Sequence, residues 1–77
     1  MSGTINVTSE LTAAVLSVAV EPGVMVAQGT TLAIVESMKM EIPIPAPAAG
    51  TVTTVKIAPG DVVAEGDTMV VLEPADT

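Results

Sequence analysis

The sequence repeats itself with an offset of 37 residues, and this repeat constrains the fold more than any other feature. When residues 13–36 are placed over residues 50–73, nine of the 24 aligned positions are identical. The identical positions include Pro-Gly dipeptides that begin at residues 22 and 59, each followed by a second glycine in register. Such self-similarity indicates two copies of one structural unit. Because a unit this short cannot bury an apolar face alone, we expect the two copies to pack together.

Each copy predicts β-strands. Apolar and polar residues alternate over 15–20 and 52–57, and a second apolar run follows in each copy, at 32–36 and 69–73. Alternation rich in β-branched residues is typical of half-buried strands. The recurring Pro and Gly residues indicate turns and exclude long helices. We therefore expect an all-β fold of about eight strands, arranged as two sheets packed face to face or as a flattened barrel, with a pseudo-two-fold axis.

Composition excludes several classes of function. The 77 residues include nine acidic side chains and two lysines, for a net charge of −7, and no His, Cys or aromatic residue. Nucleic acids and anionic membrane surfaces bind clustered cations, so neither is an expected partner. Without His and Cys, imidazole acid–base chemistry and the commonest transition-metal ligands are missing, and we expect no metal site.

Length and the N-terminal residues predict one cytoplasmic domain. No apolar run approaches the roughly 20 residues of a membrane-spanning helix, and the first ten residues lack the basic and apolar regions of a secretory signal. We expect a single domain over residues 1–77, with its core at about 7–73, that is a monomer in isolation.

One of the two lysines lies where the two copies meet. Lys39 stands between Met38 and Met40 in the segment 36–41, and residues of strand character lie on both sides. We expect a hairpin tip here that joins the two copies. A tight turn without Gly, Asn or Asp would hold a residue at an unfavourable φ, at a cost of order 1 kcal/mol. These features favour a role for the lysine beyond solubility.

Three prolines follow this tip. Pro43, Pro45 and Pro47 alternate with apolar residues, so all three remove backbone donors from the same edge of a strand. Proline is found on edge strands for this reason. The pattern predicts an edge strand that is protected against aggregation, and recognition of a partner is the alternative.

Lys39 is not expected to be a catalytic nucleophile. Catalytic lysines lose their charge through burial or a neighbouring cation, whereas Glu36 and Glu41 lie close in sequence and the chain is acidic. A charged and exposed lysine is suited to modification by a separate enzyme, which brings its own activated acyl group and removes the charge by forming an amide.

These residues resemble the biotinyl domain of biotin-dependent carboxylases, the biotin carboxyl carrier family. The resemblance covers residues 7–73 and centres on Glu-Ser-Met-Lys-Met at 36–40, followed by Ala-Pro-Ala-Ala-Gly-Thr-Val at 46–52. It implies the biotinyl/lipoyl attachment fold, a barrel-sandwich hybrid of two four-stranded antiparallel sheets, with Lys39 on an exposed turn.

The resemblance also implies a function. A biotin protein ligase would attach biotin covalently to Lys39, and Met38 and Met40 match the methionines that flank the modified lysine, either as recognition residues or as apolar filler. The chain would be a non-catalytic carrier, either a stand-alone protein or a domain excised from a larger one, that shuttles carboxyl groups between the biotin carboxylase and carboxyltransferase components of a carboxylase system.

Departures from the family pattern leave some expectations open. Ser9-Glu10 and Ala13 stand where the second copy has Ala46-Pro47 and Gly50, so the geometry of the first strand and turn is open. A lipoyl carrier domain of a 2-oxo acid dehydrogenase complex is one alternative, although Asp and Ala or Val commonly flank its lysine. An unmodified structural or interaction barrel is another. In each case we expect Lys56 to stay unmodified.

Overall fold

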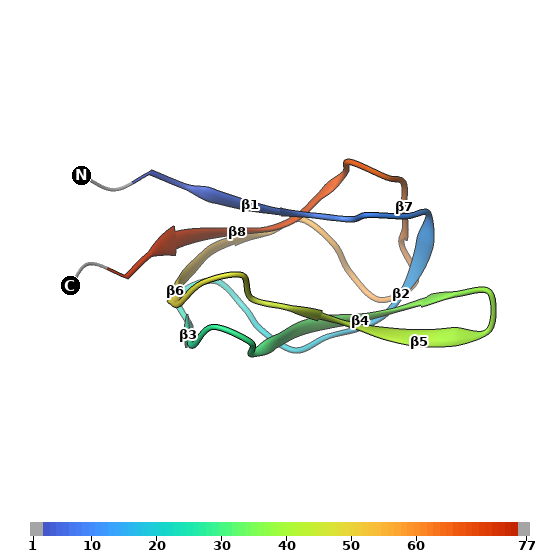
Figure 1. Ribbon diagram of the computed structural model, residues 1–77, viewed down its shortest axis with the longest axis horizontal. Coiled ribbons are helices and arrows are strands. Elements are labelled where there is room, and N and C mark those ends of the chain that lie inside the picture. Colours follow the sequence, from blue (N-terminus) through green and yellow to red (C-terminus); the bar gives the residue numbers. More distant parts are fainter. Residues whose placement is uncertain (1–2, 76–77) are drawn as a thin grey trace.

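The computed structural model describes residues 3–75, and these residues form eight β-strands. The strands are β1 (Ile5–Thr8), β2 (Ala13–Val18), β3 (Met25–Val26), β4 (Thr31–Ser37), β5 (Met40–Pro45), β6 (Gly50–Val55), β7 (Val62–Val63) and β8 (Thr68–Pro74). They make two four-stranded antiparallel sheets, ordered β1-β8-β6-β3 and β5-β4-β2-β7. Figure 1 shows the β4–β5 hairpin projecting from one end. The described residues include no helix with the length and hydropathy to cross a membrane. The all-β, two-sheet prediction is confirmed.

The two copies of the repeat interlace. Each sheet contains strands from both copies, because β1 pairs with β8, β3 pairs with β6, and β7 pairs with β2. When each strand of one sheet is replaced by its equivalent 37 residues earlier or later in the chain, the strand order of the other sheet results. Hydrophobic periodicity reports which face of a strand is buried and does not report its neighbour. The sequence pattern therefore could not predict that the two copies exchange strands.

The turns of the two copies have the same backbone. Gly23 and Gly60 have φ of 96° and 95°, and Gly29 and Gly66 have φ of 90° and 91°. Residues with a Cβ rarely adopt this conformation, which explains why glycine stands at all four turns. Hydrogen bonds repeat as well: the Gly23 N–H donates to the Val52 carbonyl at 2.7 Å, and the Gly60 N–H donates to the Val15 carbonyl at 2.8 Å.

A β-bulge explains the spacing of apolar residues in β2. The register against β4 shifts between Val15 and Ser17, so Leu16 is an extra residue that points to solvent. The inward-facing positions are therefore Val15, Val18 and Val20, with a gap of three before the alternation resumes. The equivalent shift occurs in β6. The strand ends at Val18, two residues earlier than alternation alone predicted.

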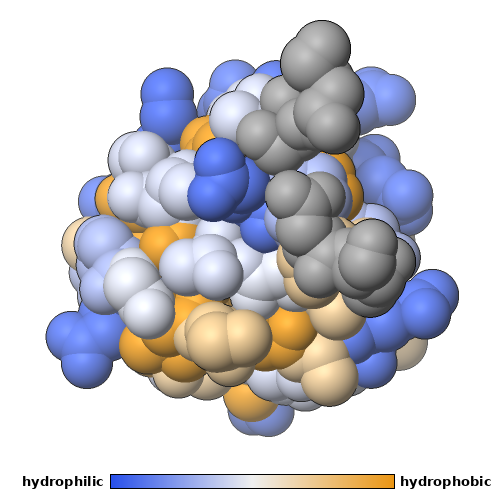
Figure 2. Space-filling model, turned by 90° about the vertical axis from the view of Figure 1, so that its left-hand side faces the viewer, coloured by the Kyte–Doolittle hydropathy of each residue, from blue (hydrophilic) through white to orange (hydrophobic). Residues whose placement is uncertain are grey.

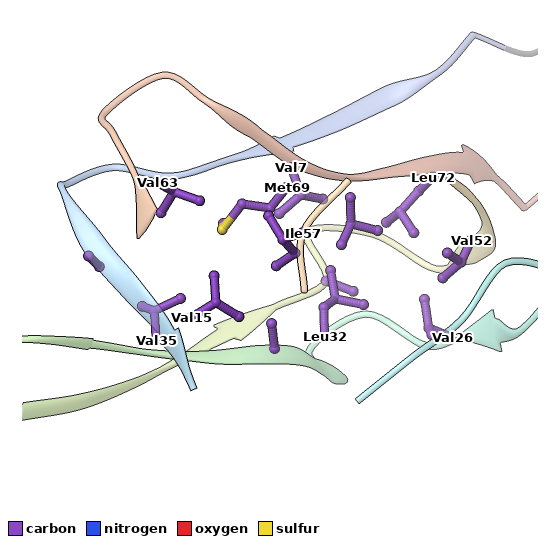
Figure 3. Close-up of a cluster of buried hydrophobic side chains, with 14 residues drawn as sticks. Val7, Val15, Val26, Leu32, Val35, Val52, Ile57, Val63, Met69 and Leu72 are labelled. Atoms are coloured by element: carbon purple, nitrogen blue, oxygen red, sulfur yellow. The ribbon is translucent and has the colours of Figure 1, made fainter. Parts of the chain in front are cut away.

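The core lies between the two sheets and is entirely aliphatic apart from methionine. Figure 3 shows side chains from both sheets meeting there. The fully buried large side chains are Leu32, Met69, Leu72, Val15, Val35, Val52 and Val70. Buried apolar residues run from Val7 to Leu72, while strand pairing extends from Ile5 to Pro74. Without aromatic residues, close packing of these small side chains supplies the hydrophobic stabilisation.

The first strand and turn keep the geometry of the second copy. The Ser9 N–H donates to the Asp67 carbonyl at 2.9 Å, and the equivalent Ala46 N–H donates to the Thr30 carbonyl at 2.8 Å. Ser9 is buried, and its hydroxyl donates to the Leu11 carbonyl. The substitution of serine for alanine is thus accommodated because the extra polar group has a partner.

Candidate functional site

The β4–β5 hairpin carries the lysine at its apex. Cα partners run from Thr31 and Pro45 to Ser37 and Met40, so the connection consists of two residues, Met38 and Lys39. The strands extend further into the Glu-Ser-Met-Lys-Met-Glu segment than the sequence predicted. The predicted hairpin joining the two copies is confirmed, and its turn is the shortest that connects antiparallel strands tightly.

Both residues of this turn have a positive φ. The values are 54° for Met38 and 66° for Lys39, and these are the non-glycine residues with positive φ in the part of the chain that the structure describes. Two positive φ values are typical of a type I′ turn, where Asn and Gly are favoured. A side chain with Cβ costs roughly 1–2 kcal/mol per residue in this conformation. The predicted unfavourable φ at a non-glycine residue of the tip is therefore confirmed.

The apex presents its side chains to solvent. Met38 is 91% exposed and Met40 is 64% exposed, and Lys39 is exposed between them. None of the side-chain hydrogen bonds among residues 3–75 involves Lys39. An amine flanked by two flexible apolar side chains is open to approach by another protein, and methionine adapts its shape to many contact surfaces.

Two carboxylates face each other next to the apex. Glu36 and Glu41 are cross-strand partners one pair away from the turn, and both are exposed. Like charges directly opposite one another are destabilising. The hairpin therefore combines a strained turn with a repulsive pair, and both lie within three residues of the lysine.

The strand that follows the apex lies at a sheet edge, as predicted. β5 is the outer strand of its sheet and contains Pro43 and Pro45. The prediction was wrong for Pro47, which lies beyond the end of the strand because β5 stops at Pro45. The Ala46 N–H donates towards β4, to the Thr30 carbonyl, so by alternation the two prolines have their nitrogens on the open edge.

The second lysine is in a different setting. Lys56 is exposed and follows directly after β6, where its N–H donates to the Met69 carbonyl at 2.8 Å. It was predicted to lie on a strand, and it lies one residue past the end of one. Its main chain is fixed by the neighbouring strand, whereas that of Lys39 reverses direction. Among residues 3–75, no group of three His, Cys, Asp or Glu side chains is placed to hold a metal ion.

Comparison with known proteins gives one matching family model, two mycobacterial relatives and similar solved structures. The family model for biotin-requiring enzymes matches residues 3–72. A biotinylated protein TB7.3 homolog of Mycobacterium leprae (strain TN) is 46% identical over 48 residues, which are 62% of this chain and 68% of that protein. A homolog of the same name from Mycolicibacterium smegmatis is 49% identical over 39 residues, which are 51% of this chain and 55% of that protein.

Solved structures show the same fold. A single-chain, multi-domain long-chain acyl-CoA carboxylase superposes with a TM-score of 0.88 and 34% identity, over 96% of this chain and 8% of that chain. The Kluyveromyces lactis urea carboxylase superposes with a TM-score of 0.85 and 28% identity, over 91% of this chain and 6% of that chain. The chain thus matches a small part of each carboxylase. The match to the family model over residues 3–72 and these two superpositions lead to one assignment: the chain belongs to the biotin-requiring enzyme family.

Proposed function

We propose that this chain is a biotin carrier, in which residues 1–77 form one biotinyl domain and Lys39 holds biotin in amide linkage. The single observation that carries the proposal is the position of Lys39 at the exposed apex of a two-residue turn. The membership of the biotin-requiring family supports biotin as the cofactor, and the name of the mycobacterial relatives describes them as biotinylated.

The residues at the apex fit attachment by an external enzyme. In the amide-forming step, the Lys39 Nζ attacks the carbonyl carbon of an activated biotinyl group. A C–N bond forms, the bond from that carbon to its leaving group breaks, and the leaving group departs with the electron pair. The amine loses two protons in all and the positive charge is removed. Because the chain has no histidine, we assign the acid–base work to a biotin protein ligase.

The neighbours of Lys39 have supporting roles in this proposal. Met38 and Met40 offer apolar contact surface to the ligase and then to the enzymes that the arm visits. The short hairpin turn fixes the direction in which the lysine side chain leaves the domain.

The partners follow from the carrier role. When bound, biotin carries a carboxyl group, and we propose that it does so between a biotin carboxylase site and a carboxyltransferase site. Tethering replaces free diffusion by a high local concentration at each site. In this scheme the chain itself is non-catalytic, acts in the cytoplasm and is a monomer between visits. The structural similarity of this chain to parts of two carboxylases supports these partners.

The test is the intact mass of the full chain after co-expression with a biotin ligase and, separately, with a lipoate ligase. We expect one biotin adduct on the wild type and on Lys56→Ala, and none on Lys39→Ala. Far-UV circular dichroism of Lys39→Ala should match the wild type. A lipoate adduct at Lys39 in place of biotin, an adduct at Lys56, or no adduct would each contradict the proposal.

A further inference from the structure

The two outer strands β1 and β5 are equivalent in the repeat but differ in their open edges. A shift of 37 residues places Asn6 and Thr8 of β1 at the positions of Pro43 and Pro45 of β5. The Ser9 N–H donates inward to the Asp67 carbonyl. Because backbone groups alternate along a strand, the N–H and C=O groups of Asn6 and Thr8 point to the open edge. β5 has prolines at these positions and therefore lacks these donors, whereas β1 retains them.

A groove lies between these two strands. It has a volume of about 420 Å³ and is lined by residues of β1, β5 and the segments that follow them. Its apolar lining includes Leu11, Ile42 and Ile44, which are partly buried and pack on the core. One wall therefore carries free backbone donors and acceptors, and the other wall is formed by Pro43 and Pro45 and has no donor on that side.

We propose that the open edge of β1 and this groove bind an extended segment of another protein, with alternating aliphatic and cationic side chains. The segment pairs with β1 through the N–H and C=O groups of Asn6 and Thr8, giving up to four hydrogen bonds. Its aliphatic side chains, which fall on one face, enter the groove and pack on the isoleucines and prolines. Addition of a strand to a sheet edge is a recurring mode of peptide recognition, in which the main chain gives affinity and pockets for alternate side chains give specificity.

The negative charge of the chain favours a cationic segment as the binding partner of the groove. The chain has a net charge of −7, Glu10 lines the groove, and neither lysine does. A second copy of this chain would bring the same negative charge, so pairing of two β1 edges is opposed electrostatically. A cationic segment is attracted by the same field. The groove does not include Lys39, so this site is separate from the biotin attachment proposed above.

The experiment uses the isotope-labelled full chain and a blocked hexapeptide of alternating lysine and valine as the probe. We expect the peptide to shift the backbone amide resonances of Asn6 and Thr8 and to slow their hydrogen exchange. A hexapeptide of alternating glutamate and valine tests the charge argument, and it should bind at least about tenfold more weakly. The lysine–valine peptide should bind the wild type equally well with and without biotin on Lys39, because the groove does not include that residue.

A matched pair of double variants tests the role of the backbone. Asn6→Pro with Thr8→Pro removes both edge donors, and the backbone should accept it because Pro43 and Pro45 occupy the equivalent positions of β5. Asn6→Ala with Thr8→Ala changes the same side chains and keeps both donors. We expect the proline pair to weaken lysine–valine binding by about tenfold or more and the alanine pair to leave it nearly unchanged. Circular dichroism checks that both variants are folded.

Four results would overturn the inference. These are equal binding by the proline and alanine pairs, equal binding of the acidic and cationic peptides, no response of the Asn6 and Thr8 amides to the cationic peptide, and protection of these amides that rises with protein concentration in the absence of peptide. The last result would assign the edge to a second copy of the chain.

Discussion

The ends of β4 and β8 are equivalent in the repeat. A comparison of these two strand ends shows that the candidate site lies where the two copies differ. Both strands have seven residues and the same order of buried and exposed positions. β8 ends at Pro74, whereas β4 continues through a tight turn into β5. The lysine lies where the repeat stops being symmetric.

The turns show what this asymmetry means. All four turns that the copies share have glycine at the positive-φ position, so their residues suit the backbone. The apex turn has Met38 and Lys39 at positive φ instead, and Glu36 faces Glu41 beside it. If stability alone determined the residues of this turn, asparagine or glycine would be expected at positions 38 and 39. Local strain of this kind, seen at one turn and absent from four others, fits a segment that is selected for recognition.

The largest effect should come from Gly50 and its counterpart Ala13. A Cβ on Gly50 would overlap the carbonyl oxygen of Glu73, so Gly50→Ala should destabilise the fold by about 3 kcal/mol. Ala13 is buried at the equivalent position but has no partner in β4, because the β2–β4 pairing stops at Ala14 and Glu36, so Ala13→Gly should cost only about 1 kcal/mol. Urea unfolding followed by far-UV circular dichroism measures both, since the chain has no aromatic chromophore. Equal losses for the two variants would contradict this reading of the asymmetry.

Equivalent substitutions in the turns that the two copies share should destabilise the fold equally. No atom outside the immediate chain neighbours lies within 4 Å of a Cβ placed on Gly23 or Gly60, so alanine there meets backbone strain alone. Gly23→Ala and Gly60→Ala should each destabilise the fold by about 1–2 kcal/mol. The same urea series compares them. A difference between the two beyond experimental error would show that the copies are not energetically equivalent.

A substitution that suits positive φ in the apex turn should stabilise the fold, whereas the substitutions in the shared turns destabilise it. Met38→Asn places a residue that tolerates positive φ in the type I′ turn and should stabilise the fold by roughly 0.5–1 kcal/mol. Thermal unfolding of the full chain measures the gain. Loss of stability in this variant would indicate that the exposed methionine makes a contribution beyond its backbone strain. The rate of biotinylation of the same variant reports separately on recognition of Met38.

The smallest effect should come from the repulsive pair. Glu36→Gln removes the like charge opposite Glu41 and should stabilise the hairpin by about 0.3 kcal/mol at low salt, with a smaller gain at high salt. Glu73→Gln is the matched control, because Glu73 is equivalent to Glu36 but faces Thr51. A gain in both variants would point to the overall negative charge and not to the pair.

Much of this architecture could be predicted from the sequence. The repeat gave the two related halves, and the alternation and turn residues gave the strands and the hairpin at Lys39. The bulge at Leu16 could have been found from the gap of three between Val15 and Val18. The two-residue strands β3 and β7 could not be placed from the sequence, because two residues show no periodicity. Strand partners and the groove beside β1 depend on contacts far apart in the chain, which local patterns do not encode.

The shape of the molecule has a practical consequence. Its principal extents are 39, 19 and 17 Å, and the start of β1 and the end of β8 lie at the end opposite the hairpin apex (Figure 1). Figure 2 views that opposite end, where hydrophilic residues surround a smaller hydrophobic area. A fluorophore, bead or fused protein joined beyond either strand would therefore be held a molecular length away from Lys39. If Lys39 accepts biotin, the chain would serve as a compact acceptor tag that anchors its cargo to streptavidin without crowding the anchored end.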